Sequence, residues 1–243
     1  MTAAPRLLWR GEEEVAAIKP AGLSCERPEA PAAESLLVWL RRELAVEDCW
    51  LPHRLDRLAR GIVLAAVTRE AAAFHSEQIR ARRWEKTYLA RIVPERGRRS
   101  DELLGPHAVY LRTVGRIAKV VRSGGQPARL EVLAVAPAPE RNGHEHVLIR
   151  LHTGRYHQIR AMLEHLGAPL AGDPLYGGMR GGGQEPPYLE HAVLRLPLRE
   201  GRRRTLFLAE DPDRERLHPS LEKQLQAVAD DADDRATDSI GTC

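Results

Sequence analysis

An α+β fold with a mixed, mostly antiparallel central sheet, flanked by a few helices and loops, is expected for this chain of 243 residues. Candidate strands occur in runs with few helices between them, which favours antiparallel pairing over alternating βαβ units. The dipeptide Asn142-Gly143 separates two apolar segments and is a strong signal for a tight hairpin, because both central residues of that turn need positive φ. Hydrophobic residues make up 43% of the sequence, which is enough to form a core.

The strands are recognised as short apolar runs bounded by turn residues. Residues 62–67 form a continuous apolar run, which is typical of a fully buried strand. Lys19, Pro20 and Gly22 end the first run. The expected strands are residues 14–18, 62–67, 86–93, 108–114, 116–121, 129–135, 146–151, 191–198 and 204–209.

Helical spacing of apolar residues predicts helices over 34–44, 69–82 and 155–166. Thr68 is the expected cap of the second helix and Thr153 that of the third, since a threonine hydroxyl can accept a bond from a free backbone N–H. The third helix has a clear apolar stripe and should end at a glycine. These residues are Ile159, Met162, Leu163, Leu166 and Gly167.

Charge divides the chain into a basic body and an acidic tail. The net charge is +3, but residues 219–243 carry six acidic and two basic side chains, a net of −4, so residues 1–218 carry +7. We expect residues 1–218 to form one folded domain. Residues 219–243 are rich in Asp and Ala and are expected to be disordered.

The basic residues indicate a polyanionic partner such as nucleic acid. Only four of the 37 are lysine, and the guanidinium fork of the other 33 suits phosphate and stacks on bases. A genomic bias towards arginine codons with a solvated surface explains the charge equally well. The sequence has no apolar run near the ~20 residues that span a bilayer and no signal peptide, and its three cysteines are too scattered for a disulfide framework or a metal site. A cytoplasmic protein is expected.

The stretch WLPHRLDRLARGIVLAA (50–66) places one carboxylate, Asp56, among basic side chains directly before the apolar run. The basic neighbours are His53, Arg54, Arg57 and Arg60. Such a carboxylate is either part of a structural ion pair or a charge that is kept ionised for chemistry.

A second stretch, HTGRYHQIRAMLEHLG (152–167), opens the third predicted helix. Arginines and a threonine at a helix N-terminus are a natural phosphate site. A solvated helix face is the alternative explanation of Arg155 and Arg160, but the position of Arg160 favours a functional one. Arg160 falls beside the apolar stripe, where an unpaired arginine is costly, and therefore needs an acidic partner. The candidate partners are Asp56, Asp173 and Glu164.

The two stretches resemble the signatures of the RluA-type pseudouridine synthase family, approximately H-R-L-D-x-x-T-S-G and T-G-R-x-H-Q-I-R, the latter followed by L-G-x-P-x-x-G-D-x-x-Y-G. Further matches occur in the same order along the chain, and the resemblance covers about residues 7–210. These matches are Lys19-Pro20-Ala21-Gly22, Lys86-x-Tyr88-x-Ala90, Asp173, Tyr176 and Leu189-x-His191-Ala192.

The resemblance implies an RNA-modifying isomerase that converts uridine in structured rRNA or tRNA to pseudouridine without a cofactor or metal. It implies that residues 1–218 are the catalytic domain, with an active-site cleft across the sheet. Many members carry an accessory RNA-binding domain before this core, and none is expected here. A monomer that acts on RNA without a protein partner is the simplest expectation.

The resemblance also assigns roles to single residues. Asp56 corresponds to the catalytic carboxylate, and Arg160 to the arginine that pairs with it and keeps it ionised. Tyr88 corresponds to the tyrosine that stacks on the target base and helps to remove a proton. Arg54 corresponds to the arginine that fills the space of the flipped base. The remaining residues assigned to RNA binding, the pocket wall or site support are His53, Arg60, Lys86, Arg155, His157 and Ile159.

One departure concerns the residues after the aspartate. Ala59 and Arg60 stand where the family has threonine and serine. We expect Arg60 either to shift the loop geometry or to contact a phosphate. The same departure motivates an alternative hypothesis, a non-catalytic RNA-binding or RNA-folding protein that retains the synthase fold. Hydrolysis of a nucleoside by the same carboxylate is a remote third hypothesis.

Overall fold

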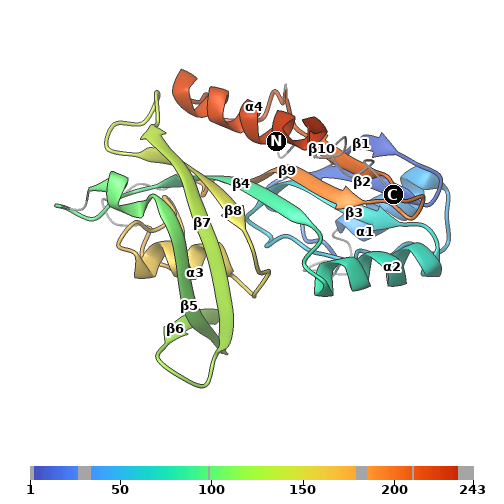
Figure 1. Cartoon of the computed structure of the whole chain (residues 1–243), viewed down its shortest axis with the longest axis horizontal. Coiled ribbons are helices and arrows are strands. Elements are labelled where there is room, and N and C mark those ends of the chain that lie inside the picture. The colour runs from blue at the N-terminus through green and yellow to red at the C-terminus, as the bar shows by residue number, and fades with distance from the viewer. Residues whose placement is uncertain (1–2, 27–33, 98, 179–184, 210, 235–243) are drawn as a thin grey trace, which may run out of the picture. The chain divides into compact units, whose positions relative to one another are not determined.

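The computed structural model of the protein describes residues 3–26, 34–97, 99–178, 185–209 and 211–234. The described chain forms two compact units. Unit 1 contains the described residues of Met1–Glu85, Glu190–Asp213 and Ala232–Cys243, and unit 2 those of Lys86–Leu189 and Arg214–Asp231. Figure 1 labels the elements of both units.

Unit 1 is a five-stranded arrangement in the order β1-β2-β3-β9-β10. Three of its four strand pairs are antiparallel, and the short β3–β9 pair is parallel. Apolar side chains such as Ile62, Leu64 and Leu194 form its core together with Trp84. The elements are β1 (Arg6–Arg10), β2 (Glu14–Lys19), α1 (Leu36–Leu44), β3 (Arg60–Ala66), α2 (Arg69–Arg80), β9 (Leu189–Pro197) and β10 (Arg203–Phe207).

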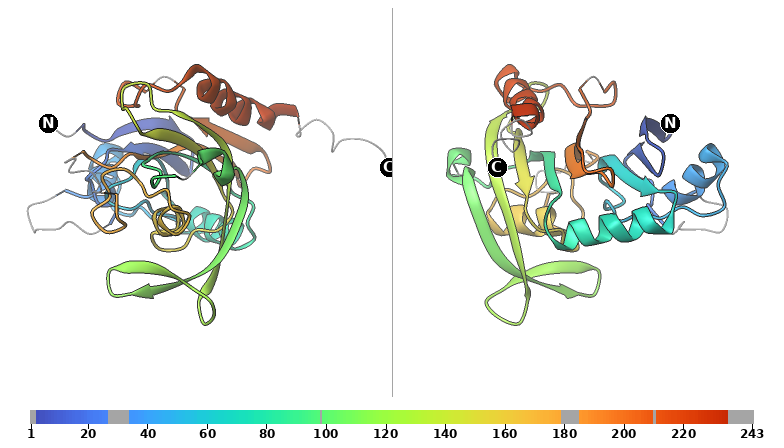
Figure 2. Two further views of the ribbon diagram at one scale, coloured as in Figure 1. Left: turned by 90° about the vertical axis from the view of Figure 1, so that its left-hand side faces the viewer. Right: turned by 45° about the vertical axis from the view of Figure 1, so that its right-hand side comes forward.

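Unit 2 contains five antiparallel strands in the order β4-β8-β7-β5-β6. Strands β5 and β7 form a long curved ribbon that carries the β6 hairpin at one end (Figure 2). The elements are β4 (Glu85–Ile92), the 3-10 helix Ser100–Leu103, β5 (Gly105–Val114), β6 (Ile117–Val121), β7 (Gln126–Pro137), β8 (Glu145–Leu151), α3 (Gln158–His165) and α4 (Pro219–Asp234).

These elements confirm the α+β expectation with mostly antiparallel strands. Thr68 caps α2 as predicted, because its hydroxyl accepts a bond from the Ala71 N–H at 3.2 Å. Every predicted strand is present, and β1 is an additional one. The hairpin between β7 and β8 is also present, but its connection is longer than a two-residue turn. Gly143 has positive φ there and Asn142 does not, so the two-residue turn was wrong.

The predicted start of the third helix was also wrong. Helix α3 begins at Gln158, and its N-cap residue is His157, which has a φ of 51° and makes no capping bond through its side chain. Thr153 does not cap the helix, because its hydroxyl accepts a bond from the Arg129 N–H at 2.9 Å and donates to Gln158 Oε1 at 2.8 Å. The threonine therefore ties the loop before α3 to strand β7.

The expectation of disorder from residue 219 onwards was wrong for Pro219–Asp234, which form α4. Leu221, Leu225 and Ala229 are spaced four residues apart and are buried, so the acidic composition conceals a narrow apolar stripe. Residues 235–243 lie outside the described part of the chain. Within that part, the helices are too short or too polar to cross a membrane.

Candidate active site

Asp56 opens a turn directly before β3. The Ala59 N–H donates to the Asp56 carbonyl at 3.0 Å, which closes the turn. The flanking Leu55 and Ala59 are buried, whereas Asp56 is partly exposed. Arg54 is exposed and forms a surface ion pair with Glu26 at 3.0 Å. The turn therefore buries Leu55 and Ala59 and leaves Asp56 partly exposed.

Lys19, at the end of β2, joins the loop after β2 to this turn at Arg57. Its side chain is fully buried, and its ammonium donates to the carbonyls of Pro20, Leu23 and Arg57 at 3.0, 2.8 and 3.2 Å. Burial lowers the pKa of Lys19 to about 8, although the negative charge of Asp56 opposes this shift. Lys19 thus provides positive charge beside Asp56 within unit 1.

Backbone and thiol contacts join the same two segments. The Gly22 N–H donates to the Arg57 carbonyl at 2.8 Å, and Arg57 Nε donates to the Gly22 carbonyl at 2.9 Å. The Cys25 sulfur lies 3.4 Å from the Leu55 nitrogen and 3.5 Å from its carbonyl oxygen. Residues 20–25 therefore hold the chain on both sides of Asp56.

His53 lies inside the same unit. Its Nε2 accepts a bond from the Leu64 N–H of β3 at 2.9 Å, and its ring meets the rings of Trp84 and His191 edge to face. These contacts give His53 a structural role in holding the chain before Asp56 against β3. They do not support the expected contact with RNA.

Arg60 is the first residue of β3 and is 6% exposed. Its Nη1 donates to Glu190 Oε2, and its Nη2 donates to Asp211 Oδ1 at 2.8 Å. Asp211 also pairs with Arg6 at 2.7 Å. Burial alone would raise the pKa of Asp211, but hydrogen bonds from Arg6 and from the Asp213 N–H, with the charge of Arg60, bring that pKa below its usual value.

This placement does not support a contact between Arg60 and an RNA phosphate, because the guanidinium is buried against two carboxylates. The next residue shows how closely the chain is packed. Gly61 has a φ of 111°, and a Cβ at this position would lie 2.4 Å from the His191 carbonyl oxygen. Only glycine fits there, so the entry from the Asp56 turn into β3 is sterically fixed.

In unit 2, Tyr88 and Lys86 lie two residues apart on β4 and so on the same face of the strand. Tyr88 is buried and pairs in register with Ile149 of β8. Lys86 is partly buried, and this desolvation lowers its pKa. Its Nζ lies 3.5 Å from the position that a Cβ on Gly154 would occupy, so the lysine reaches the loop before α3.

Helix α3 supplies Arg160 and Ile159, which are both buried. Arg160 donates to both oxygens of Asp173, through Nε at 2.7 Å and Nη2 at 2.9 Å. Its guanidinium also lies 4.9 Å from the centre of the Tyr176 ring. Of the three acidic partners considered from the sequence, Asp173 is the one with this bidentate bond. The pairing of Arg160 with Asp56 stays a prediction.

The loop before α3 is tied down by its own side chains. The Nδ1 atom of His157 lies 3.1 Å from the Tyr176 hydroxyl, and its ring stacks on Tyr156 with 3.8 Å between ring centres. Arg155 is partly exposed and donates through Nε to the Pro127 carbonyl at 3.2 Å. His157 therefore positions the loop, whereas Arg155 remains accessible to a ligand.

The geometry thus supplies an accessible carboxylate in unit 1 and a buried tyrosine with a buried arginine in unit 2. Such groups can carry out nucleophilic and proton-transfer chemistry. Among the described residues, no group of three or more His, Cys, Asp or Glu side chains could hold a metal ion. Sequence reasoning gave no role to Glu190 and Asp211, and no motif marks either residue.

Comparison with known proteins finds a match to the family model described as RNA pseudouridylate synthase over residues 15–165. Ribosomal large subunit pseudouridine synthase D of Xanthomonas campestris is 32% identical over 178 residues, which cover 71% of this chain and 51% of that protein. tRNA pseudouridine synthase C of Haemophilus ducreyi is 30% identical over 184 residues, which cover 71% and 74%. The chain spans about half the length of the first curated relatives it matches.

Two solved structures share the fold. Human RNA Pseudouridylate Synthase Domain Containing 1 aligns with a TM-score of 0.71 at 21% identity, covering 93% of this chain and 94% of that one. Human RNA Pseudouridylate Synthase Domain Containing 4 aligns with a TM-score of 0.64 at 21% identity, covering 91% of each chain.

Proposed function

Because the chain belongs to the RNA pseudouridylate synthase family, we propose that it isomerises uridine to pseudouridine in structured rRNA or tRNA. Membership confirms the resemblance seen in the sequence motifs. The observation that carries the proposal is that the matched residues, 15–165, include Asp56, Tyr88 and Arg160. The relatives named above act, by their names, on ribosomal large-subunit RNA and on tRNA.

In the proposed reaction the C–N glycosidic bond of a uridine breaks, the uracil turns while it is held, and a C–C bond forms. Asp56 is the ionised carboxylate, which attacks either the sugar or the base. Tyr88 stacks on the base and helps to remove the C5 proton. Arg160 keeps Asp56 ionised. A guanidinium has five N–H donors, so an arginine that binds Asp173 through two of them can also bind a second carboxylate.

A basic surface on unit 2 supports RNA as the partner. Residues 105–130, from β5 through β6 into the start of β7, contain no Asp or Glu. Five exposed cations lie along this ribbon, and Tyr110 beside them is 50% exposed. Cations that neutralise phosphates release counterions, so RNA affinity should fall steeply with salt. The five residues are Arg112, Arg116, Lys119, Arg122 and Arg129.

The test is release of tritium from RNA labelled at C5 of uridine, because isomerisation exchanges that hydrogen. The substrate is total RNA from cells that lack this gene. Wild-type protein should release tritium, and Asp56→Asn should reduce the rate by at least about a thousandfold, since the amide cannot replace the ionised carboxylate. Equal release by both proteins would exclude Asp56 as the catalytic group. No release by the wild type would favour the non-catalytic RNA-binding hypothesis.

A further inference from the structure

We propose that Arg60 is a positioning residue, which sets the location of the Asp56 carboxylate through an ion-pair network with Glu190, Asp211 and Arg6. This inference rests on the catalytic role proposed for Asp56. It explains why an arginine, Arg60, can stand at the position of the serine in the motif that this chain resembles.

The chain between Asp56 and Arg60 is short and closed. Residues 56–59 form a turn whose Ala59 N–H binds the Asp56 carbonyl at 3.0 Å, and such turns hold their first and fourth Cα atoms within about 7 Å. Arg60 follows this turn at once and stands opposite Glu190 in the parallel β3–β9 pair. A displacement of Arg60 therefore moves the turn and the carboxylate that it carries.

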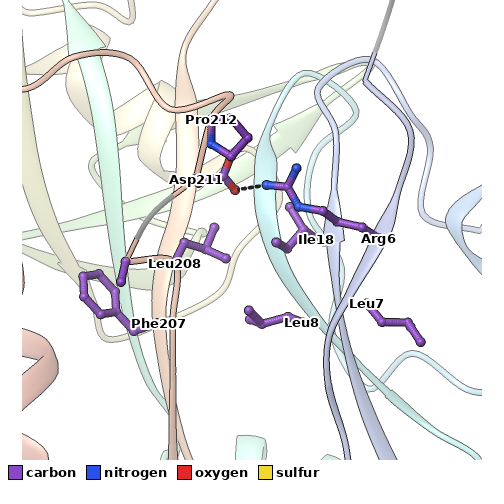
Figure 3. Close-up of a pocket in the computed structure, with 9 residues that line it drawn as sticks. Arg6, Leu7, Leu8, Ile18, Phe207, Leu208, Asp211 and Pro212 are labelled. Atoms are coloured by element: carbon purple, nitrogen blue, oxygen red, sulfur yellow. Dashed lines mark ion pairs between the residues drawn. The ribbon is translucent and has the colours of Figure 1, made fainter.

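The network anchors this point to two other segments of unit 1. Arg60 binds Glu190 at the start of β9 and Asp211 after β10. Figure 3 shows Asp211 facing Arg6 of β1, and both residues line a pocket. Their ion pair measures 2.7 Å. The side chains of Arg60, Glu190 and Asp211 are 7%, 0% and 1% exposed, and that of Arg6 is 38% exposed. Two cations and two anions thus neutralise one another.

The planar fork of arginine is what this arrangement requires. Arg60 directs one terminal nitrogen to each carboxylate, and the two acids come from different segments. Lysine would keep the charge, but as a single flexible point charge it cannot reproduce the fixed geometry. The burial of the guanidinium also separates this role from phosphate binding, which needs an accessible cation.

The experiment compares Arg60→Lys, which keeps the charge, with Asp211→Asn, which keeps the shape. The second variant acts from the far side of the network and keeps the proposal testable if the first one fails to fold. The control is Arg195→Lys, because Arg195 on β9 is similarly buried and pairs with Glu85 at 2.9 Å, away from the Asp56 turn. Each protein is assayed by tritium release from C5-labelled total RNA of cells that lack this gene.

Three quantities are measured for each protein. The first is the pair of kinetic constants, kcat and KM, determined separately. The second is the salt dependence of affinity for the same RNA without label. The third is amide hydrogen exchange at Ala59, whose N–H closes the Asp56 turn.

If Arg60 positions the Asp56 carboxylate, Arg60→Lys and Asp211→Asn should each lower kcat by about tenfold to a hundredfold. A misplacement of a catalytic group by about 1 Å can have this effect. KM and the salt slope should stay unchanged, and the Ala59 amide should exchange at least about tenfold faster, because the turn opens more often. The control should change none of these quantities.

Two outcomes overturn the proposal. A higher KM with a log–log salt slope that is smaller by about 0.7 to 0.9 would show that Arg60 contacts a phosphate instead. Folded variants with unchanged kcat and unchanged Ala59 exchange would show that the network supports only the fold. Amide exchange also separates this inference from the proposed function. If the wild type is inactive but exchange at Ala59 still accelerates, the function fails and the control of the turn by Arg60 stands.

Discussion

Two different kinds of interaction hold the chain around Asp56. Lys19 and residues 20–25, the N-terminal anchor, bind Leu55 and Arg57 on either side of Asp56, mostly through backbone carbonyls and amides. Arg60, which follows the turn, uses a network of charged side chains from three other segments. The N-terminal anchor contains Lys19-Pro20-Ala21-Gly22, which resembles a family motif, whereas Arg60 stands where that resemblance places a serine. The turn that carries Asp56 is therefore held by one anchor of backbone contacts and one of buried charges.

The difference predicts unequal losses of stability, with the largest for Arg60→Ala. This change leaves Glu190 and Asp211 buried with their main cation removed, which should lower the free energy of unfolding by about 3–5 kcal/mol. Urea unfolding monitored by circular dichroism measures it. The control is Arg199→Ala, which breaks an exposed pair with Glu13 and should cost no more than about 1 kcal/mol. Equal losses for the two variants would contradict the proposed importance of the buried network.

Lys19→Met should have a smaller effect, a loss of about 2 kcal/mol. It removes the donor from the Pro20, Leu23 and Arg57 carbonyls, and an unsatisfied buried acceptor is costly. The loss is limited because the variant no longer has to bury an ammonium group. The same unfolding assay compares it with Arg60→Ala. A larger loss for Lys19→Met would reverse the order of the two anchors.

The pH dependence of stability tests the charge of Lys19 directly. Its pKa is about 8 in the folded protein and near its usual value of 10.5 in the unfolded chain. Between these values the unfolded state binds more protons, so the free energy of unfolding rises with pH. Relative to Lys19→Met, the wild type should gain about 1 kcal/mol between pH 8.5 and 9.5. Chemical denaturation of both proteins at several pH values measures this difference, and a flat difference would show that Lys19 titrates normally.

These two anchors also mark the limit of sequence reasoning. The apolar run after Asp56 predicts β3 because strand burial is a local pattern. The position of Arg160 beside an apolar stripe predicts a buried arginine with an acidic partner, which the bond with Asp173 confirms. In contrast, Glu190 and Asp211 lie 130 and 151 residues from Arg60 along the chain. Only the folded topology brings them together, and no local pattern indicates this.

Two predictions from the sequence were wrong, the helix cap at Thr153 and the disorder from residue 219 onwards. Thr153 has the residue type of a helix cap, but its hydroxyl binds Arg129 and Gln158 instead. The tail from residue 219 has a disordered composition, yet its three buried apolar residues are enough to form α4. In both cases contacts in the folded protein outweighed a local rule, based on residue type for Thr153 and on composition for the tail. This is common because most helix stability in proteins comes from packing.

The smallest expected effect comes from the thiol that assists the N-terminal anchor. Cys25→Ala removes the contacts of sulfur with the Leu55 N–H and carbonyl at 3.4 and 3.5 Å, which are weak because sulfur is a poor hydrogen-bond donor and acceptor. Cys49→Ala is a matched control, since Cys49 is also a buried thiol, at 2% exposure. Within the described part of the chain, the Cys49 sulfur makes no hydrogen bond. The difference between the two variants in urea unfolding should be at most about 1 kcal/mol. A difference above about 2 kcal/mol would show that the thiol, rather than Lys19, is the main support of the N-terminal anchor.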